Sequence, residues 1–215
     1  MPPFDRPSYA EHLASLADND PSAPAWLMPG RETMSRAALA ARIDDAGRRF
    51  GEWGIGRGDI VAWPVIERDA SSLLAVVPAI ATLAPLSAGM TPEAYARTYE
   101  RLRVKAVVLP RAVRHAAAEA ADRAGVTIIE SVGSTTNLAG AVDLGLARAT
   151  ATLGRAAHVD RDVMFVSHTS GTTGKPKLVP HAWGPVAVTA QALGAVLGIR
   201  EDDVSAHMTS LHLAN

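Results

Sequence analysis

Cysteine is absent from the sequence and aromatic side chains are scarce. The lack of cysteine excludes disulfide bonds, thiolate metal sites and cysteine nucleophiles, and it is compatible with a reducing compartment. Aromatic residues make up 5% of the 215 residues, which argues against a surface that stacks nucleic-acid bases. Basic and acidic side chains number 21 and 22, so no charge excess attracts nucleic acid or an anionic membrane.

Long apolar runs are also missing. The longest, residues 73–86, contains Pro78 and Pro85 and is shorter than the roughly 20 residues that a membrane-spanning helix needs. The first residues lack the basic segment and apolar run of a secretory signal. We therefore expect a cytoplasmic protein without a membrane span and without a nucleic-acid partner.

The remaining pattern alternates between strand-like and helix-like segments. Apolar residues spaced by three and four positions predict a helix over 35–53, and shorter apolar runs predict strands. This alternation favours an α/β fold with a mostly parallel sheet flanked by helices. The expected helices cover residues 8–18, 35–53, 69–83, 91–102, 111–124 and 182–197, and the expected strands 60–66, 105–110, 126–131, 163–168, 177–180 and 203–208.

Three other segments complete this organisation. Residues 25–35 have the pattern of a small hairpin, with Pro29-Gly30 at its turn. Residues 133–160 are expected to form a long surface connection. Residues 1–7 are expected to be a loose N-terminus, and residues 8–215 to form one structural unit.

The segment "VSHTSGTTGKPKLVPH", residues 166–181, carries the clearest chemical signal. Its glycines and hydroxyl side chains are typical of a turn that directs backbone N–H groups toward an anion. A lysine adds the compact charge that suits a phosphate. The segment therefore predicts a polyphosphate site, and a hairpin turn without a ligand remains the alternative.

Several known phosphate and catalytic motifs do not fit. A Walker loop needs four residues between its glycines, whereas Gly171 and Gly174 are closer together and Pro176 follows Lys175. The second glycine cluster, "GEWGIGRGD" at 51–59, precedes a predicted strand instead of following one, so it indicates a helix end and a turn. The histidines His168, His181, His207 and His212 lack the spacing of a zinc motif and do not predict a metal site.

The stretch "TSGTTGKPK" resembles the phosphate-loop signature of the adenylate-forming superfamily, which includes acyl-CoA synthetases, luciferases and the adenylation domains of peptide synthetases. Weaker similarity lies in "ETMSRAALAARIDDAGRRFGEWGIGRGDIVA", in "ATLAPLSAGMTPEAYARTYERLRVKAVV" and in "HMTSLHLAN". The resemblance begins near residue 8 and covers the first part of that family's catalytic unit. It implies the N-terminal part of an AMP-binding domain, without the C-terminal half and the lid domain.

The resemblance also implies a chemistry. ATP and a small carboxylic acid form an acyl-adenylate and pyrophosphate, and a thiol of coenzyme A or of a carrier protein then takes the acyl group. Mg²⁺ is held through Thr172 or Thr173, and His212 orients the carboxylate, whereas His181 is expected to be structural. The residues implied to grip the ATP phosphates are Thr169, Ser170, Gly171, Thr172, Thr173, Gly174 and Lys177.

Three functions remain open from the sequence. The first is the N-terminal part of an acid-activating ligase, similar to an acyl-CoA synthetase, which works with a missing C-terminal half or a partner chain. The second is a non-catalytic module that binds a nucleotide or a phosphate. The third is a decayed interaction protein, in which an incomplete sheet leaves an edge and an apolar patch. The acid that is activated is not readable from these residues.

Overall fold

The computed structural model describes residues 8–66, 70–111, 113, 115–149, 160, 162–169, 177–207 and 211. The expected loose N-terminus at 1–7 lies outside these residues. Helices and strands follow in the order α1 (Tyr9–Asn19), β1 (Pro24–Trp26), β2 (Met34–Ser35), α2 (Arg36–Glu52), β3 (Ile60–Pro64), α3 (Leu73–Ile80), β4 (Thr82–Leu86), α4 (Pro92–Leu102), β5 (Ala106–Pro110), α5 (Ala116–Ala124), β6 (Thr127–Gly133), β7 (Val142–Arg148), β8 (Val163–Thr169), β9 (Lys177–Ala182) and α6 (Trp183–Leu197).

A seven-stranded sheet lies at the centre of the fold, with the strand order β7-β6-β5-β3-β4-β8-β9. Strands β3, β4, β5, β6 and β8 run parallel to one another. The two outermost strands, β7 and β9, are antiparallel to their neighbours. The predicted mostly parallel sheet flanked by helices is therefore confirmed.

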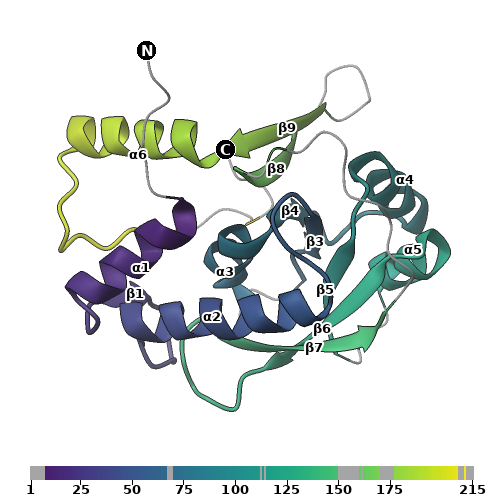
Figure 1. The fold of residues 1–215 in the computed structure, drawn as a ribbon, viewed down its shortest axis with the longest axis horizontal. Helices are drawn as coiled ribbons and strands as arrows, with labels where there is room; N and C mark the ends of the chain where they lie inside the picture. Colours follow the sequence, from purple (N-terminus) through teal and green to yellow (C-terminus); the bar gives the residue numbers. More distant parts are fainter. Residues whose placement is uncertain are drawn as a thin grey trace.

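The central strands are buried on both faces. In β3, Val61 and Trp63 belong to a core cluster with α2 and α3, whereas Ile60 and Ala62 belong to a second cluster with α4 and α5. Because side chains alternate between the faces of a strand, a strand covered on both sides is apolar throughout. Figure 1 shows α2 and α3 apart from α4 and α5, with the sheet between the two groups.

Local signals explain where several helices begin and end. Thr91 Oγ1 accepts a hydrogen bond from Ala94 N at 3.2 Å, and Pro92 occupies the first position of α4. Ser8 and Glu11 form the predicted capping box of α1. No described helix combines the length and the apolarity that crossing a membrane requires.

Three predictions from the sequence are wrong. The helix expected over 69–83 ends at Ile80, and strand β4 follows it. Periodicity does not separate a buried helix from a buried strand in such an apolar run. The connection expected over 133–160 contains β7, whose "VDLGLAR" alternates apolar and polar residues at its start. Residues 203–207 of the expected last strand form no strand.

The segment before β7 packs closely against β1 and the start of α3. Gly140 has a φ of +68°, and a Cβ atom there would lie 2.9 Å from Trp26 Cδ1 and 3.0 Å from Ser71 Oγ. Trp26 Nε1 donates a hydrogen bond to Ser71 Oγ at 2.8 Å, which holds both neighbours in place. Position 140 therefore requires glycine for two reasons: its φ is positive, and a Cβ atom would come too close to Trp26 and Ser71.

Replacing Gly140 with alanine is expected to lower the free energy of unfolding. The left-handed backbone costs about 1–2 kcal/mol for a residue with a Cβ atom, and the overlap with Trp26 adds about 1–3 kcal/mol. Gly125→Ala is the matched control, because Gly125 has a φ of +64° and its Cβ would meet nothing within 4 Å. Urea unfolding of both variants measures the difference, and equal losses would contradict the packing argument.

Candidate functional site

The predicted phosphate loop joins two antiparallel strands. Thr169, the last residue of β8, is paired with Lys177, the first residue of β9. The loop residues between them, 170–176, lie outside the described residues. The predicted contacts of Ser170, Gly171, Thr172, Thr173 and Gly174 therefore stay predictions, whereas Lys177 is exposed at the base of the loop.

The hairpin places this loop at one defined edge of the sheet. Strand β8 runs parallel to β4, with Leu83 opposite Phe165, so both strands end at the same edge. In open α/β sheets, ligands bind outside the carboxyl ends of the parallel strands. The glycine cluster at 51–59 precedes β3 and lies at the opposite edge, which agrees with its interpretation as a turn.

Two buried hydroxyl groups support the hairpin below the loop. Thr82 Oγ1 donates a hydrogen bond to the carbonyl of Val163 at 2.7 Å, and this links β4 to the start of β8. Ser167 Oγ lies 2.8 Å from His181 Nε2, and this links β8 to β9. His181 Nε2 therefore has a partner in β8, and the residue lies near the end of β9, two positions before α6 begins, so it is near a helix start as predicted.

Sequence reasoning did not find the partnership between Ser167 and His181. Ser167 is opposite Val179 in the hairpin, so His181 is its diagonal neighbour on the same face. This contact could be predicted only from the pairing of Thr169 with Lys177, because that register determines which residues of β8 and β9 face each other.

His168 points to the other face of the hairpin and is held in an apolar setting. Its cross-strand partner, Leu178, packs against the core cluster that includes α4 and α5. The Nε2 atom of His168 is buried and has no hydrogen-bond partner among the described residues. Burial, and to a smaller extent the charge of Arg101, lowers the pKa of His168.

The predicted catalytic residue His212 lies outside the described residues. The residue before it, Leu211, is partly buried against the core cluster of α2 and α3. The chain therefore returns to the sheet at that point, and the role of His212 stays a prediction.

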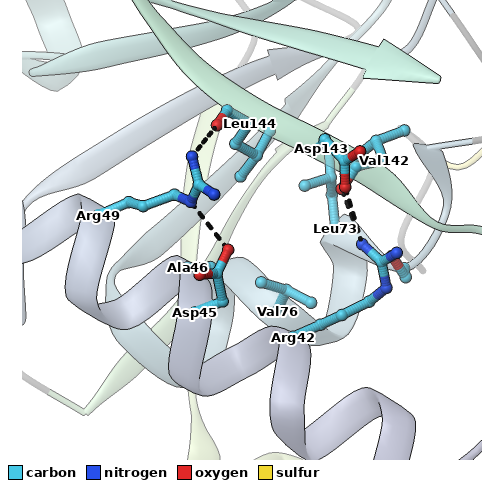
Figure 2. Close-up of a pocket in the computed structure, with 10 residues that line it drawn as sticks. Arg42, Asp45, Ala46, Arg49, Leu73, Val76, Val142, Asp143 and Leu144 are labelled. Carbon is cyan, nitrogen blue, oxygen red and sulfur yellow. Dashed lines mark hydrogen bonds and ion pairs between the residues drawn. The ribbon is translucent and has the colours of Figure 1, made fainter. Parts of the chain in front are cut away.

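A small hollow between α2 and β7 contains two arginines, and Figure 2 shows how both are engaged. Arg42 donates a hydrogen bond to the carbonyl of Val142 at 3.0 Å, and Arg49 donates one to the carbonyl of Leu144 at 3.1 Å. Arg49 also pairs with Asp45 at 2.8 Å. The hollow measures about 30 Å³, which leaves room for water but not for a nucleotide. These arginines donate hydrogen bonds to backbone carbonyl groups at the outer edge of β7, and they do not form a phosphate site.

A larger hollow of about 250 Å³ lies among α1, β1 and α2. Its lining is mainly apolar and includes Leu13, Leu16, Trp26 and Leu39. Neither hollow includes a residue of the hairpin. The hairpin loop is therefore the candidate site on the strength of its sequence and its position at the sheet edge.

Comparison with known proteins gives consistent matches. A family described as "AMP-binding enzyme" matches residues 13–215. The chain is 30% identical over 198 residues to an oxalate–CoA ligase of Arabidopsis thaliana, which covers 89% of the chain and 38% of that protein. It is 27% identical over 183 residues to a probable CoA ligase, CCL9, of Humulus lupulus, and the match covers 83% of the chain and 35% of that protein. Apo MatB from Rhodopseudomonas palustris has the same fold, with a TM-score of 0.67 and 25% sequence identity. The match covers 90% of this chain and 39% of MatB. The chain thus spans less than two fifths of the length of the two curated relatives.

The setting of His168 predicts that acid destabilises the protein. The lowered pKa means that the unfolded chain binds this proton at a higher pH than the folded chain does. The free energy of unfolding therefore falls as the pH decreases below about 6.5, by at most ~1.4 kcal/mol per pH unit from this group. In His168→Leu this contribution disappears.

Urea unfolding at pH 7.5 and 5.5 measures the effect as the difference between the wild-type chain and His168→Leu. His207→Leu is the control, since His207 is exposed. A pH dependence that is the same in the wild-type chain and in both variants would refute the role of His168.

Proposed function

Because the chain belongs to the AMP-binding enzyme family, we propose that it supplies the ATP phosphate-binding hairpin of an acid-activating ligase. In this reaction a small carboxylic acid attacks the α-phosphate of ATP, and pyrophosphate leaves. The thiol of coenzyme A, or of a carrier protein, then attacks the acyl-adenylate and AMP leaves. The names of the two curated relatives, both CoA ligases, support this class. The observation that carries the proposal is the "TSGTTGKPK" sequence, whose first and last residues, Thr169 and Lys177, pair where β8 ends at the carboxyl edge of the sheet.

The proposed loop contacts follow from the charge of the substrate. Negative charge on the leaving pyrophosphate is best stabilised by donors that are already in place. The proposed donors are the hydroxyls of Thr169, Ser170, Thr172 and Thr173 and the backbone N–H groups near Gly171 and Gly174. Their number and their closeness in the chain suit a polyphosphate better than a single carboxylate.

Lys177 is the proposed cationic contact. Its place at the first position of β9, opposite Thr169, fixes its backbone by strand pairing on one side. Its side chain is exposed, so the ammonium group is accessible to a phosphate that binds in the loop. Lys175 lies within the loop, outside the described residues, and is not assigned a role.

The side chains of Thr172 and Thr173 are the proposed contacts of Mg²⁺. Hydroxyl oxygens are hard ligands, and Mg²⁺ takes its remaining ligands from phosphate oxygens and water. The ion neutralises phosphate charge when it is bound.

The remaining catalytic residues are proposed to belong to a further part of the enzyme, which corresponds to the portion of the relatives that this chain does not match. Residues 8–215 are then the N-terminal part of the AMP-binding domain, and His212 orients the carboxylate at the boundary with the remaining part. An acyl-CoA synthetase in the cytoplasm is the proposed setting. The length comparison, 38% of the Arabidopsis ligase, supports a division of the site between this chain and further residues.

A second candidate is a module that binds ATP without catalysing adenylation. ATP binding is common to both candidates, and exchange of pyrophosphate into ATP is not. The exchange reaction in the presence of a carboxylic acid and the complementary part of the enzyme therefore distinguishes them.

Removing the proposed phosphate contacts is expected to weaken binding of MgATP. A charge-assisted hydrogen bond contributes about 1.5–3 kcal/mol, so Lys177→Ala should raise the dissociation constant by roughly tenfold to a hundredfold. Lys177→Ala combined with Thr172→Ala should abolish the increase in melting temperature that millimolar MgATP causes.

Arg200→Ala is the matched control, because Arg200 is an exposed cation beyond the far end of α6. Isothermal titration of the wild-type chain and of all three variants provides the affinities. An affinity for MgATP that the double substitution leaves unchanged would refute the phosphate site.

A further inference from the structure

The larger hollow, between the first two helices, has the make-up of a small-molecule site. Its volume is about 250 Å³, and its walls come from α1, β1, α2 and α3. Figure 1 shows α1, β1 and α2 next to one another. Ligand sites are concave and mainly apolar, and a few polar groups fix the orientation of the ligand. The apolar part of the lining consists mainly of Leu13, Leu16, Pro24, Trp26, Leu39 and Ala75.

Two polar side chains, those of Tyr9 and Arg36, line the same hollow. Arg36 is half-buried, and its guanidinium makes no hydrogen bond or ion pair with any other residue that the structure describes. The hydroxyl of Tyr9 likewise has no hydrogen-bond partner among those residues, and burial raises the pKa of Tyr9 to about 12. By contrast, Arg42 and Arg49 of the same helix both bond to carbonyls of β7. Because unsatisfied polar groups are costly away from water, both donors at the hollow call for an acceptor.

The charge of the lining indicates what kind of acceptor fits. Among the described residues that line the hollow, none is acidic, and Arg36 is the cation. A neutral apolar ligand would leave the guanidinium unpaired, and a doubly charged anion would exceed the charge of one arginine. A guanidinium matches a carboxylate through two parallel N–H···O bonds, and a phenol can donate a third hydrogen bond to it. The hollow therefore suits a monoanionic carboxylate with an apolar body.

The volume of the hollow indicates the size of that body. One water molecule occupies about 30 Å³ of the liquid, so 250 Å³ has room for roughly eight groups of that size. Six carbon atoms and the two oxygens of a carboxylate make up that number. Hexanoate is therefore the straight-chain acid that matches the hollow in both charge and size.

The hollow is separate from the proposed phosphate site. The ring of Tyr9 lies 5.1 Å from the ring of Trp183, which follows β9 directly. Lys177 is at the other end of this six-residue strand. At about 3.4 Å per residue, the two ends of β9 are roughly 17 Å apart. A ligand in the hollow is therefore bound away from the phosphates that the loop is proposed to hold.

We propose that this hollow is a second ligand site, which binds a small monocarboxylic acid with an unbranched apolar chain. The carboxylate lies against the guanidinium of Arg36 and the hydroxyl of Tyr9, and the chain packs on the leucines and on Trp26. The inference goes beyond the proposed function and does not depend on it, because none of these residues belongs to the phosphate loop.

Hexanoate is the probe, and Trp26 in the wall of the hollow provides a signal for its binding. The 215-residue chain is titrated with sodium hexanoate at constant ionic strength, with tryptophan fluorescence and isothermal titration as the two measurements. Because the chain has four tryptophans, Trp26→Phe identifies the share of the fluorescence change that comes from the hollow. A ligand with about eight non-hydrogen atoms is expected to bind in the millimolar range.

Three variants test the two parts of the site. Arg36→Gln should weaken hexanoate binding at least about tenfold, because it removes a charge-assisted pair. Ala40→Leu should abolish binding, because Ala40 lines the hollow and a larger side chain fills it. Arg97→Gln is the matched control, since Arg97 is an exposed arginine of α4, a helix on the other face of the sheet, and it should bind hexanoate as the wild-type chain does. Melting temperatures confirm that the variants are folded.

Analogues of the probe test the charge of the ligand. Hexan-1-ol should bind the wild-type chain at least about tenfold more weakly than hexanoate does, and Arg36→Gln should leave its affinity unchanged. Tighter binding of hexyl phosphate than of hexanoate would assign the hollow to a phosphate ester and would overturn the proposal.

Two further results would also overturn it: an affinity for hexanoate that Arg36→Gln leaves unchanged, and no binding up to roughly 50 mM hexanoate. Binding that requires the removal of residues 2–7 would show that the N-terminal segment occupies the hollow in the intact chain, and it too would count against the site. Hexanoate binding with these specificities in a chain that fails to bind MgATP would support the hollow and refute the phosphate site alone.

Discussion

The buried contact between β4 and β8 is the constraint on which the position of the loop depends. Strand β9 is the last strand of the described sheet, and β8 connects it to the parallel strands. Thr82 is fully buried, and its hydroxyl reaches the carbonyl of Val163 at the start of β8. This hydrogen bond and the pairing of Leu83 with Phe165 align β8 with the strands beside it. The loop lies at the carboxyl edge of the sheet because this alignment directs the end of β8 there.

Most of the architecture could be predicted because it depends on local signals. Ser35 and Thr91 begin helices, Gly125 ends one, and the alternation of strands with helices gives a parallel sheet. Strand β4 was not found because its burial on both faces removes the alternation that distinguishes a strand. Strand β7 was not found because the glycine, serine and threonine residues before it are typical of a surface loop. The resemblance to adenylate-forming enzymes is confirmed by the family match over residues 13–215.

The candidate site also has a part that the sequence predicts and a part that it does not. The composition of residues 169–177 predicts a phosphate loop without any knowledge of the fold, and the position of Lys177 opposite Thr169 is compatible with that prediction. The contact of Ser167 with His181 and the burial of His168 depend on cross-strand register and on packing against α4. Neither is encoded in the few residues around each side chain. Sequence reasoning therefore predicted a chemistry for the loop and missed the groups that support the hairpin below it.

The two outer strands of the sheet differ in how their free edges are finished. On β7, Arg42 and Arg49 occupy the carbonyls that an additional strand would need, over the first half of its length. On β9, Pro180 lacks an N–H group, so this position cannot donate a hydrogen bond to a further strand. Because these β7 carbonyls are already occupied, pairing of a further strand with the first half of β7 is disfavoured, and this limits edge-to-edge association there.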